Sequence, residues 1–251
     1  ATMSTAMQVY FALKGGLSER YTNKCDIYIN DVDQDTCMAI WLLLHANLFE
    51  GTSSLPHINR ILTLNDRMDI TGGAFPMNLD DKVYYQHCWI FEPYTSLRKT
   101  GEIAKRNVKV YESYLQAVFG RLDKLLMGTA GEYIPEIPFD ILHSSKNLVV
   151  VDETFGGIEA RHALFANGTI KNAYLSVVAK RDDGRFVYTI GRRSRYVHFP
   201  IHQIYKKLNE IEGCQPNDCW GGSDIVGGSP RTSGSNLSWN QIVDVINHHS
   251  D

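Results

Sequence analysis

The sequence contains no apolar run of the length that a membrane-spanning helix needs, about 20 residues. It also lacks an excess of positive charge. Charged residues make up 21% of the chain and the net charge is −3, which argues against a protein that binds polyanions over its whole surface. With 43% hydrophobic residues, the chain has ample material for a core. We therefore expect one large or two small globular domains that make no contact with a membrane.

Cysteine is scarce and irregularly placed. The cysteines are Cys25, Cys37, Cys88, Cys214 and Cys219. An odd, scattered set in a chain without a recognisable signal peptide predicts a reducing, cytoplasmic setting. Cys214 and Cys219 lie close together in the sequence, but no second cysteine pair accompanies them, so their spacing does not predict a zinc site.

The most informative stretch is an acidic segment near the start of the chain. Residues 25–30 alternate between apolar and other side chains, which predicts a short strand, and the apolar run 38–49 predicts a buried helix. Between them lie Asp31, Asp33 and Asp35. In an α/β domain this position is the carboxyl end of a strand, where ligands bind in open sheets.

Two interpretations of these aspartates are open at this point. Carboxylates this close repel one another, and a divalent cation such as Mg²⁺, Mn²⁺ or Ca²⁺ would relieve the repulsion. Alternatively, the segment is a solvated turn in which Asp35 or Thr36 caps the helix that follows. The spacing alone is compatible with both.

Two further strands are predicted in the same half of the chain, at 8–13 and 60–64. Asp66 and Asp69 follow the second of them, so in a parallel sheet they would lie beside the first acidic loop. The order strand, helix, strand predicts a right-handed βαβ crossover. We therefore predict an α/β fold whose N-terminal domain is a parallel, doubly wound sheet with acidic loops at one edge.

The chain is predicted to have two domains. A helical period runs through 102–127, and the prolines that follow, from Pro135 on, do not suit a helix interior. We divide the chain into an N-terminal α/β domain at 1–127 that ends in this connecting helix, a linker at 128–146, and a smaller mixed α/β domain at 147–251.

The C-terminal domain is predicted to combine hairpins and helices around a stretch rich in glycine and serine. Its predicted strands are 147–151, 173–179 and 186–190, its predicted helices are 158–166, 201–211 and 239–247, and the glycine-rich stretch is 220–237.

This domain also carries residues that suit an anion. Glycines can adopt positive φ and let backbone N–H groups converge on an anion, and an adjacent arginine supplies a fork for phosphate. The candidate binding residues are Arg192, Arg193, Ser194, Gly221, Gly222, Gly227, Gly228, Ser229 and Arg231. The alternatives are a flexible surface loop and a solvated basic face. The stretch lacks the lysine of a P-loop, so that motif is rejected.

Both groups of residues are similar to motifs of the DHH–DHHA1 phosphoesterase superfamily. The segment Ile29-Asn-Asp-Val-Asp-Gln-Asp-Thr36 resembles its first motif, with Asp33 and Asp35 at the paired aspartates. Arg193-Ser194 and the glycines between 221 and 228 resemble the arginine–serine pair and glycine loop of its C-terminal module. The resemblance implies a parallel α/β domain joined by a helix to a smaller mixed domain.

The resemblance also implies a chemistry, that of a metal-dependent phosphoesterase acting on a nucleotide or a short oligonucleotide. Asp33 and Asp35 would be catalytic. The metal ion, Mn²⁺ or Mg²⁺, would be held by Asp31, Asp33, Asp35, Asp66 and Asp69. The oligomeric state is left open, and a homodimer is compatible with the sequence.

The chain departs from the family pattern at its histidines. Ile29 stands at the motif histidine, Ser223 at the histidine of the glycine loop, and no Asp-His-His sequence occurs. These departures favour an alternative function, a protein that binds a nucleotide or phosphate without hydrolysing it. A third interpretation is a structural or interaction protein with an incidental acidic turn.

Overall fold

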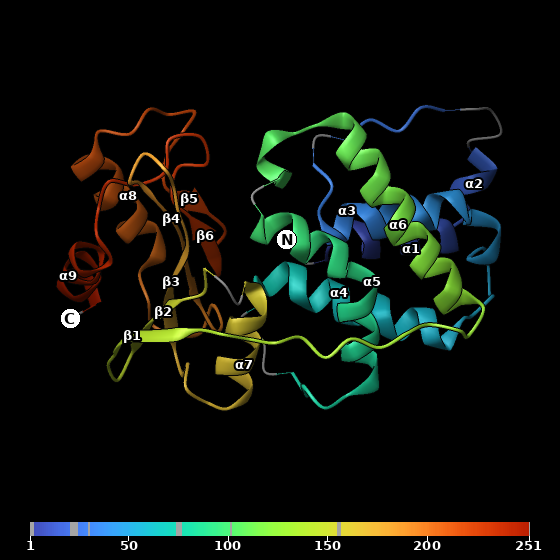
Figure 1. Cartoon of the computed structure of the whole chain (residues 1–251), viewed down its shortest axis with the longest axis horizontal. Helices are drawn as coiled ribbons and strands as arrows, with labels where there is room; N and C mark the ends of the chain where they lie inside the picture. Colours follow the sequence, from blue (N-terminus) through green and yellow to red (C-terminus); the bar gives the residue numbers. More distant parts are fainter. Residues whose placement is uncertain are drawn as a thin grey trace. The chain divides into compact units, whose positions relative to one another are not determined.

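The computed structural model describes residues 3–20, 25–29, 31–73, 77–100, 102–154 and 157–250. The chain forms two compact units (Figure 1). Unit 1 consists of Ala1–Ile70 and Asn78–Pro135, and unit 2 consists of Thr71–Met77 and Glu136–Asp251. The fold class is mixed α/β, with helices in both units and a six-stranded sheet in unit 2.

The described part of unit 1 is helical. Its elements are α1 (Thr5–Lys14), α2 (Leu17–Arg20), α3 (Gln34–Leu44), η1 (Ala46–Leu48), α4 (Pro56–Thr71), α5 (Lys82–Lys99), η2 (Glu102–Lys105) and α6 (Val108–Leu126), where η marks a 3₁₀ helix. The last residue of α4 is already the first residue of unit 2.

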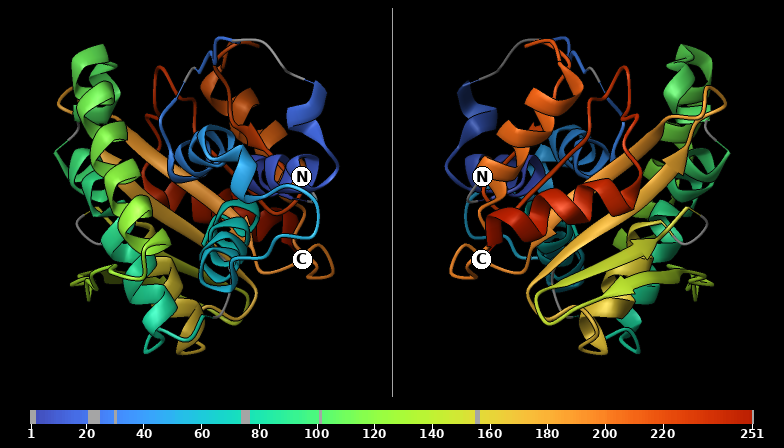
Figure 2. Two further views of the ribbon diagram at one scale, coloured as in Figure 1. Left: turned by 90° about the vertical axis from the view of Figure 1, so that its right-hand side faces the viewer. Right: turned by 90° about the vertical axis from the view of Figure 1, so that its left-hand side faces the viewer.

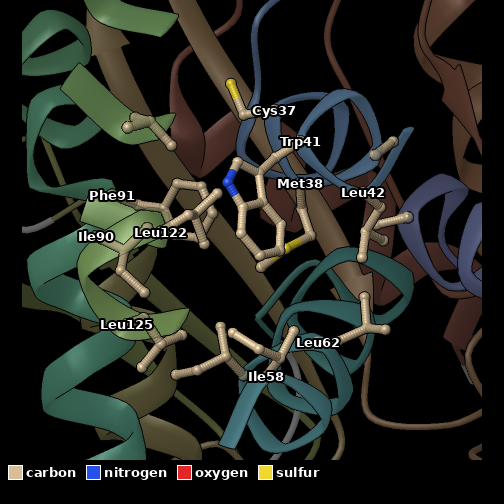
Figure 3. Close-up of a cluster of buried hydrophobic side chains, with 14 of the residues drawn as sticks. Cys37, Met38, Trp41, Leu42, Ile58, Leu62, Ile90, Phe91, Leu122 and Leu125 are labelled. Atoms are coloured by element: carbon tan, nitrogen blue, oxygen red, sulfur yellow. The ribbon is translucent and has the colours of Figure 1, made fainter. Parts of the chain in front are cut away.

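Figure 3 shows the core that these helices share. Its buried side chains include Met38, Trp41 and Leu42 of α3, Ile58 and Leu62 of α4, Ile90 and Phe91 of α5, and Leu122 and Leu125 of α6. The indole N–H of Trp41 donates to Asp123 Oδ1 at 2.8 Å, so the polar atom of this buried ring is satisfied. Isolated short helices are only marginally stable in water. Burial of the apolar surface that these helices share contributes about 25 cal/mol per Å² to the stability of the unit.

The strands predicted for the N-terminal half are wrong. Residues 8–13 lie in α1 and residues 60–64 in α4, whereas residues 25–29 have no regular secondary structure; Asn30 lies outside the described residues. The buried residues of α4 recur at helical spacing: Ile58, Ile61, Leu62, Asn65 and Met68. A window of five residues does not distinguish this pattern from a strand. The described part of unit 1 therefore contains no parallel doubly wound sheet.

The sheet of unit 2 has the strand order β1–β2–β3–β4–β6–β5. The strands are β1 (Asp140–Ser144), β2 (Leu148–Asp152), β3 (Ala173–Lys180), β4 (Phe186–Arg192), β5 (Gly221–Gly222) and β6 (Val226–Gly228). β2 and β3 run parallel, and the other neighbours pair antiparallel. The three strands predicted for this half coincide with β2, β3 and β4 to within one or two residues at each end.

Helices cover both faces of this sheet (Figures 1 and 2). They are α7 (Ile158–Ala166), α8 (Ile201–Glu212) and α9 (Trp239–Ser250). The alternation of side chains along β2 separates two clusters. Leu148 and Val150 belong to the cluster that contains α8 and α9, and Val149 and Val151 belong to the cluster that contains α7.

A buried ion pair attaches the segment Thr71–Met77 to the rest of unit 2. Arg161 of α7 is 4% exposed, and its Nε and Nη2 donate to the Glu153 carboxylate at 2.7 and 2.6 Å. Its Nη1 donates to the Gly72 carbonyl at 2.7 Å. A buried arginine must be paired to be tolerated, and the bond to the Gly72 carbonyl fixes Gly72 beside α7.

These units can be compared with the predicted domain boundaries. One division falls between Pro135 and Glu136, inside the range 128–146 predicted as the linker. The segment Thr71–Met77, however, interrupts the range 1–127 that was assigned to a single domain. The contact between Arg161 and Gly72, which joins distant parts of the sequence, explains this difference.

Candidate functional site

The glycine-rich stretch forms a tight hairpin at one edge of the sheet of unit 2 (Figure 1). β5 and β6 pair antiparallel, and β6 also pairs with β4. A Cβ atom added to Gly222 would lie 2.3 Å from Gly227 Cα, and one added to Gly227 would lie 2.2 Å from the Gly221 oxygen. Only glycine permits so close an approach of two backbones. Gly221–Gly222 and Val226–Gly228 are therefore part of the sheet and not a free surface loop.

Ser223 closes the turn of this hairpin. Its Oγ donates to the Val226 carbonyl at 3.1 Å and accepts from the N–H groups of Ile225 and Val226, both at 3.2 Å. The Ser223 N–H also donates to the Val226 carbonyl, at 2.9 Å. The hydroxyl is thus used to shape the hairpin tip.

The hairpin and α8 line an open surface pocket of about 550 Å³, which we call the glycine pocket. It is lined by His202, Tyr205, Lys206, Asn209, Glu210, Trp220, Gly221 and Gly222. Asn209 joins the two walls. Its Oδ1 accepts from the Trp220 N–H at 2.7 Å, and its Nδ2 donates to the Trp220 carbonyl at 3.0 Å. Gly221, the next residue along the chain, is held in place by this clamp.

The side chains of the glycine pocket suit an anion. Lys206 is exposed, and among the residues that the structure describes no carboxylate forms an ion pair with it. The acid in the lining, Glu210, is paired with Lys207 at 3.3 Å. His202 would add a second positive charge when protonated. A lysine beside the exposed backbone of glycines is an arrangement that binds phosphate.

A second pocket of about 300 Å³ lies at the loop 193–200 between β4 and α8, and we call it the arginine pocket. It is lined by Arg192, Arg195, Tyr196, Val197, His198, Phe199 and Pro200. Arg192 holds its shape. The Arg192 Nη1 donates to the carbonyls of Val197 and Phe199 at 3.1 and 3.2 Å, and the Nε donates to the carbonyl of Asp224 at 2.5 Å. One guanidinium group therefore ties the loop to the tip of the glycine hairpin.

Asp224, at the hairpin tip, is close to residues of both pockets. Its carboxylate pairs with Arg195 at 3.5 Å. A hydrogen bond with its own backbone, followed by the charges of Arg195, Arg192 and His202, lowers the pKa of Asp224. His202 lines the glycine pocket and Arg195 lines the arginine pocket, so the Asp224 carboxylate is close to one residue of each pocket but lines neither of them.

Tyr196 stands out from the loop of the arginine pocket, with 92% of its surface exposed. The backbone around it is ordered, since the Tyr196 N–H donates to Ser194 Oγ at 3.3 Å and the Val197 N–H donates to the Ser194 carbonyl at 3.0 Å. A single exposed aromatic ring carries no meaning by itself. An exposed ring beside an arginine, here Arg195, is an arrangement on which nucleic-acid bases stack.

The structure brings part of the predicted anion-binding set to these pockets. Gly221 and Gly222 line the glycine pocket, and Arg192 lines the arginine pocket. Gly227 and Gly228 lie in β6, where they pair with β5 and form no part of either lining.

Other predicted residues have roles elsewhere in the fold. Ser194 Oγ accepts a hydrogen bond from the Tyr196 N–H at 3.3 Å, and Ser229 Oγ accepts one from the Tyr188 N–H of β4 at 3.0 Å. The carbonyl of Arg231 accepts from Arg181 at 2.8 Å. Arg193 and Arg231 are exposed, and neither lines one of the two pockets.

The predicted acidic site of unit 1 is largely engaged in helix capping. Asp33 is the N-cap of α3 and accepts from the Thr36 N–H at 2.7 Å. Asp35 is 6% exposed and accepts from the N–H groups of Thr5 and Ala6 at 2.7 and 3.1 Å. These two N–H groups are at the start of α1, so Asp35, which lies in the first turn of α3, caps a different helix from its own.

Further contacts converge on the same helix terminus. Asp66 Oδ1 accepts from the Ser4 N–H at 2.7 Å, and Asn65 Nδ2 donates to Asp35 Oδ1 at 3.1 Å. The other side of the Asn65 amide contacts His87 Nε2 at 3.3 Å. Burial lowers the pKa of His87 to about 3, so this histidine is neutral at physiological pH. The positive end of the α1 dipole is thus the main partner of these carboxylates.

Asp69 shows the repulsion that the sequence predicts. Partial burial, followed by the charges of Asp35, Asp33 and Asp66, raises the pKa of Asp69 to about 6. The Asp69 side chain remains accessible to solvent, so the repulsion from the neighbouring carboxylates accounts for the direction of the shift in its pKa. Asp31 is bound to the N–H of the next residue at 2.8 Å. Within the described ranges, no group of three or more histidine, cysteine or acidic side chains is arranged to hold a metal ion, and the Mn²⁺ or Mg²⁺ site stays a prediction.

Sequence reasoning missed the residues of α8 that line the glycine pocket. His202, Lys206 and Asn209 follow a spacing of four and three residues, which places them on one face of a helix. That signal was available in the predicted helix 201–211. Tyr196 and Asp224 offered no comparable signal, because their positions depend on how two loops meet.

We expect Asp69→Asn to stabilise the protein at neutral pH. The folded state raises the pKa of this carboxyl from 3.8 to about 6, so between these values it binds more protons than the unfolded state, and stability falls as pH rises. The amide removes this penalty. The unfolding midpoint of the variant should exceed that of the wild type at about pH 7.5 and equal it at about pH 3.5.

Thermal denaturation at the two pH values measures the effect. Asp66→Asn is the matched control, because it removes one charge from the same group but weakens the bond to the Ser4 N–H. An equal shift of Asp69→Asn at both pH values would contradict the expectation.

Comparisons with known proteins place the chain in no family: no family model, no curated protein and no solved structure matches it. The resemblance to the DHH–DHHA1 superfamily stays a prediction from its motif residues. None of the described helices is long and apolar enough to cross a membrane.

Proposed function

We propose that this protein binds a phosphorylated small molecule, a nucleotide, in the glycine pocket and the arginine pocket of unit 2. The observation that carries the proposal is the lining of the glycine pocket. It combines Lys206, which no described carboxylate neutralises, with the side-chain-free backbone of Gly221 and Gly222. Phosphate oxygens bind to this combination of a point charge and accessible backbone.

The arginine pocket supports a nucleotide over a simple phosphate. Tyr196 offers an exposed ring for a base, and the neighbouring Arg195 is held in the same pocket by its ion pair with Asp224. Asp224 is close to Arg195 of the arginine pocket and to His202 of the glycine pocket. In our proposal the phosphate of the ligand lies in the glycine pocket and its aromatic base stacks on Tyr196. Stacking on such a ring contributes about 1–3 kcal/mol per base.

Binding without hydrolysis is the form of the proposal that the contacts support. The residues predicted to be catalytic, Asp33 and Asp35, both accept hydrogen bonds at helix N-termini in unit 1. A carboxylate that caps a helix is stabilised as an anion by the helix and is not free to coordinate a metal ion without losing that contact.

Metal-dependent phosphoester hydrolysis is the second candidate function. The raised pKa of Asp69 favours it, because a divalent cation is the usual means of relieving carboxylates that repel one another. Such a cation would polarise a phosphoryl oxygen of the substrate.

Replacement of Lys206 by methionine tests the phosphate site. We expect Lys206→Met to weaken the binding of pyrophosphate by about ten- to a hundredfold, because a charge-assisted hydrogen bond contributes about 1.5–3 kcal/mol. Isothermal titration calorimetry measures the dissociation constants. Lys146→Met is the control, since Lys146 is an exposed lysine of the same unit that lines neither pocket. Equal affinities of the two variants would refute the site.

Tyr196 variants test the nucleotide part. In Tyr196→Ala, AMP should bind about tenfold more weakly, whereas ribose 5-phosphate should bind as it does to the wild type, because only the base loses its partner. Tyr196→Phe keeps the ring and should keep the affinity for AMP. If AMP and ribose 5-phosphate bind the wild type equally well, the ligand is a phosphate ester without a recognised base.

Titration with Mn²⁺ tests the second candidate. If the acidic residues hold a metal ion, Mn²⁺ should bind to the wild type and bind at least about tenfold more weakly to Asp69→Asn, which removes a ligand but no helix cap. Calorimetry gives both affinities, and hydrolysis of a dinucleotide in the presence of Mn²⁺ gives the activity. Equal Mn²⁺ binding by the two proteins would exclude Asp69 from the site, and an absence of turnover would leave binding as the function.

A further inference from the structure

Two cysteines lie beside the glycine pocket, in the loop between α8 and β5. Cys214 and Cys219 are both free and partly buried. The turn between them is narrow: Gln215 and Asp218 form an antiparallel bridge, and the Asp218 N–H donates to the Gln215 carbonyl at 3.0 Å. In an antiparallel pair, the residue before one bridge partner lies opposite the residue after the other. The bridge between Gln215 and Asp218 therefore places Cys214 opposite Cys219.

Asn209 holds both ends of this loop. Its carbonyl accepts from the Cys214 N–H at 3.1 Å, and its side chain binds both backbone groups of Trp220, the residue after Cys219. Facing residues of an antiparallel pair have Cβ atoms about 4.5–5.5 Å apart, and disulfides need about 3.5–4.5 Å, so a small movement suffices. Burial, followed by the charges of Glu212 and then Cys219, raises the pKa of Cys214, which also indicates that the two thiols are close.

We propose that Cys214 and Cys219 form a reversible intramolecular disulfide on reaction with a small-molecule disulfide such as oxidised glutathione, and that this bond weakens ligand binding in the glycine pocket. The second part rests on the proposed function, whereas the first does not. Cytoplasmic disulfides, where they occur, are commonly transient and sense the redox state.

The reaction takes place by two thiol–disulfide exchanges. The Cys219 thiolate attacks one sulfur of oxidised glutathione, the sulfur–sulfur bond of the oxidant breaks, and one glutathione thiolate leaves. Cys214 then loses its proton and attacks Cys219 Sγ in the mixed disulfide, which releases the second glutathione thiolate. Two protein thiols are oxidised, one glutathione disulfide is reduced to two thiols, and the protons pass to the released thiolates.

The bond would act on the pocket through Trp220. Cys219 Sγ contacts the Pro216 carbonyl at 3.7 Å. To bond with Cys214 Sγ at about 2.05 Å, the Cys219 sulfur must give up this contact and move toward Cys214. The movement of residue 219 is transmitted to Trp220 and Gly221, which line the glycine pocket. The clamp of Asn209 on Trp220 is the contact that this movement strains.

Disulfide mapping on the full chain tests the first part. The protein should carry Cys25→Ser, because Cys25 is exposed and would compete for the oxidant. After incubation with oxidised glutathione and alkylation, mass spectrometry of a digest should show 214 and 219 linked, with the loss of two hydrogen atoms and full reversal by dithiothreitol. Free, alkylated cysteines or stable glutathione adducts at both positions would overturn the proposal.

Calorimetry with pyrophosphate tests the second part. The oxidised protein should bind about tenfold more weakly than the reduced protein. The double variant Cys214→Ser/Cys219→Ser, in the same background, has neither thiol and should bind equally well before and after oxidant. Equal affinity of the oxidised and reduced proteins would overturn the effect on the pocket. If the reduced protein does not bind pyrophosphate, the proposed function and the effect on the pocket both fail, and the mapping alone decides whether the disulfide forms.

Discussion

The guanidinium group of Arg192 is the contact on which the candidate site depends. It donates to two carbonyls of the loop 193–200 and to one carbonyl at the tip of the glycine hairpin. Three acceptors from two separate loops are thus satisfied by one side chain whose planar fork has little freedom. The loop and the hairpin are held against each other before any ligand arrives, which lowers the entropy that binding would cost.

The glycine pocket depends on a second constraint, the close approach of two backbones. The backbones at Gly222 and Gly227 are so close that a Cβ atom on either residue would clash with the opposite strand. Asn209 then connects this hairpin to α8 through both backbone groups of Trp220. Because α8 carries Lys206 and the hairpin carries the glycines, the clamp brings a positive charge and accessible backbone to one pocket.

The acidic residues of unit 1 show how repulsion and capping compete. Asp35 and Asp66 gain hydrogen bonds and a favourable dipole at the start of α1, so they persist as anions at close range. The repulsion acts on Asp69, whose pKa rises to about 6 among these charges. The same cluster that looks like a metal site in the sequence therefore has a structural explanation for most of its members.

The sequence by itself determined three strands and the helices of unit 2, and the two groups of candidate residues, but not β1, β5 or β6. The strands β2, β3 and β4 were predictable because side-chain alternation and a hairpin turn are local signals. The helical structure of residues 8–13 and 60–64 was not, since a window of five or six residues suits either structure until a longer window is packed in a core. Only the tertiary structure decided that Asp35 caps α1, that Gly72 joins α7, and that Asp224 is beside His202 and Arg195. Each of these contacts joins residues far apart in the chain, and a local sequence pattern does not predict a long-range contact.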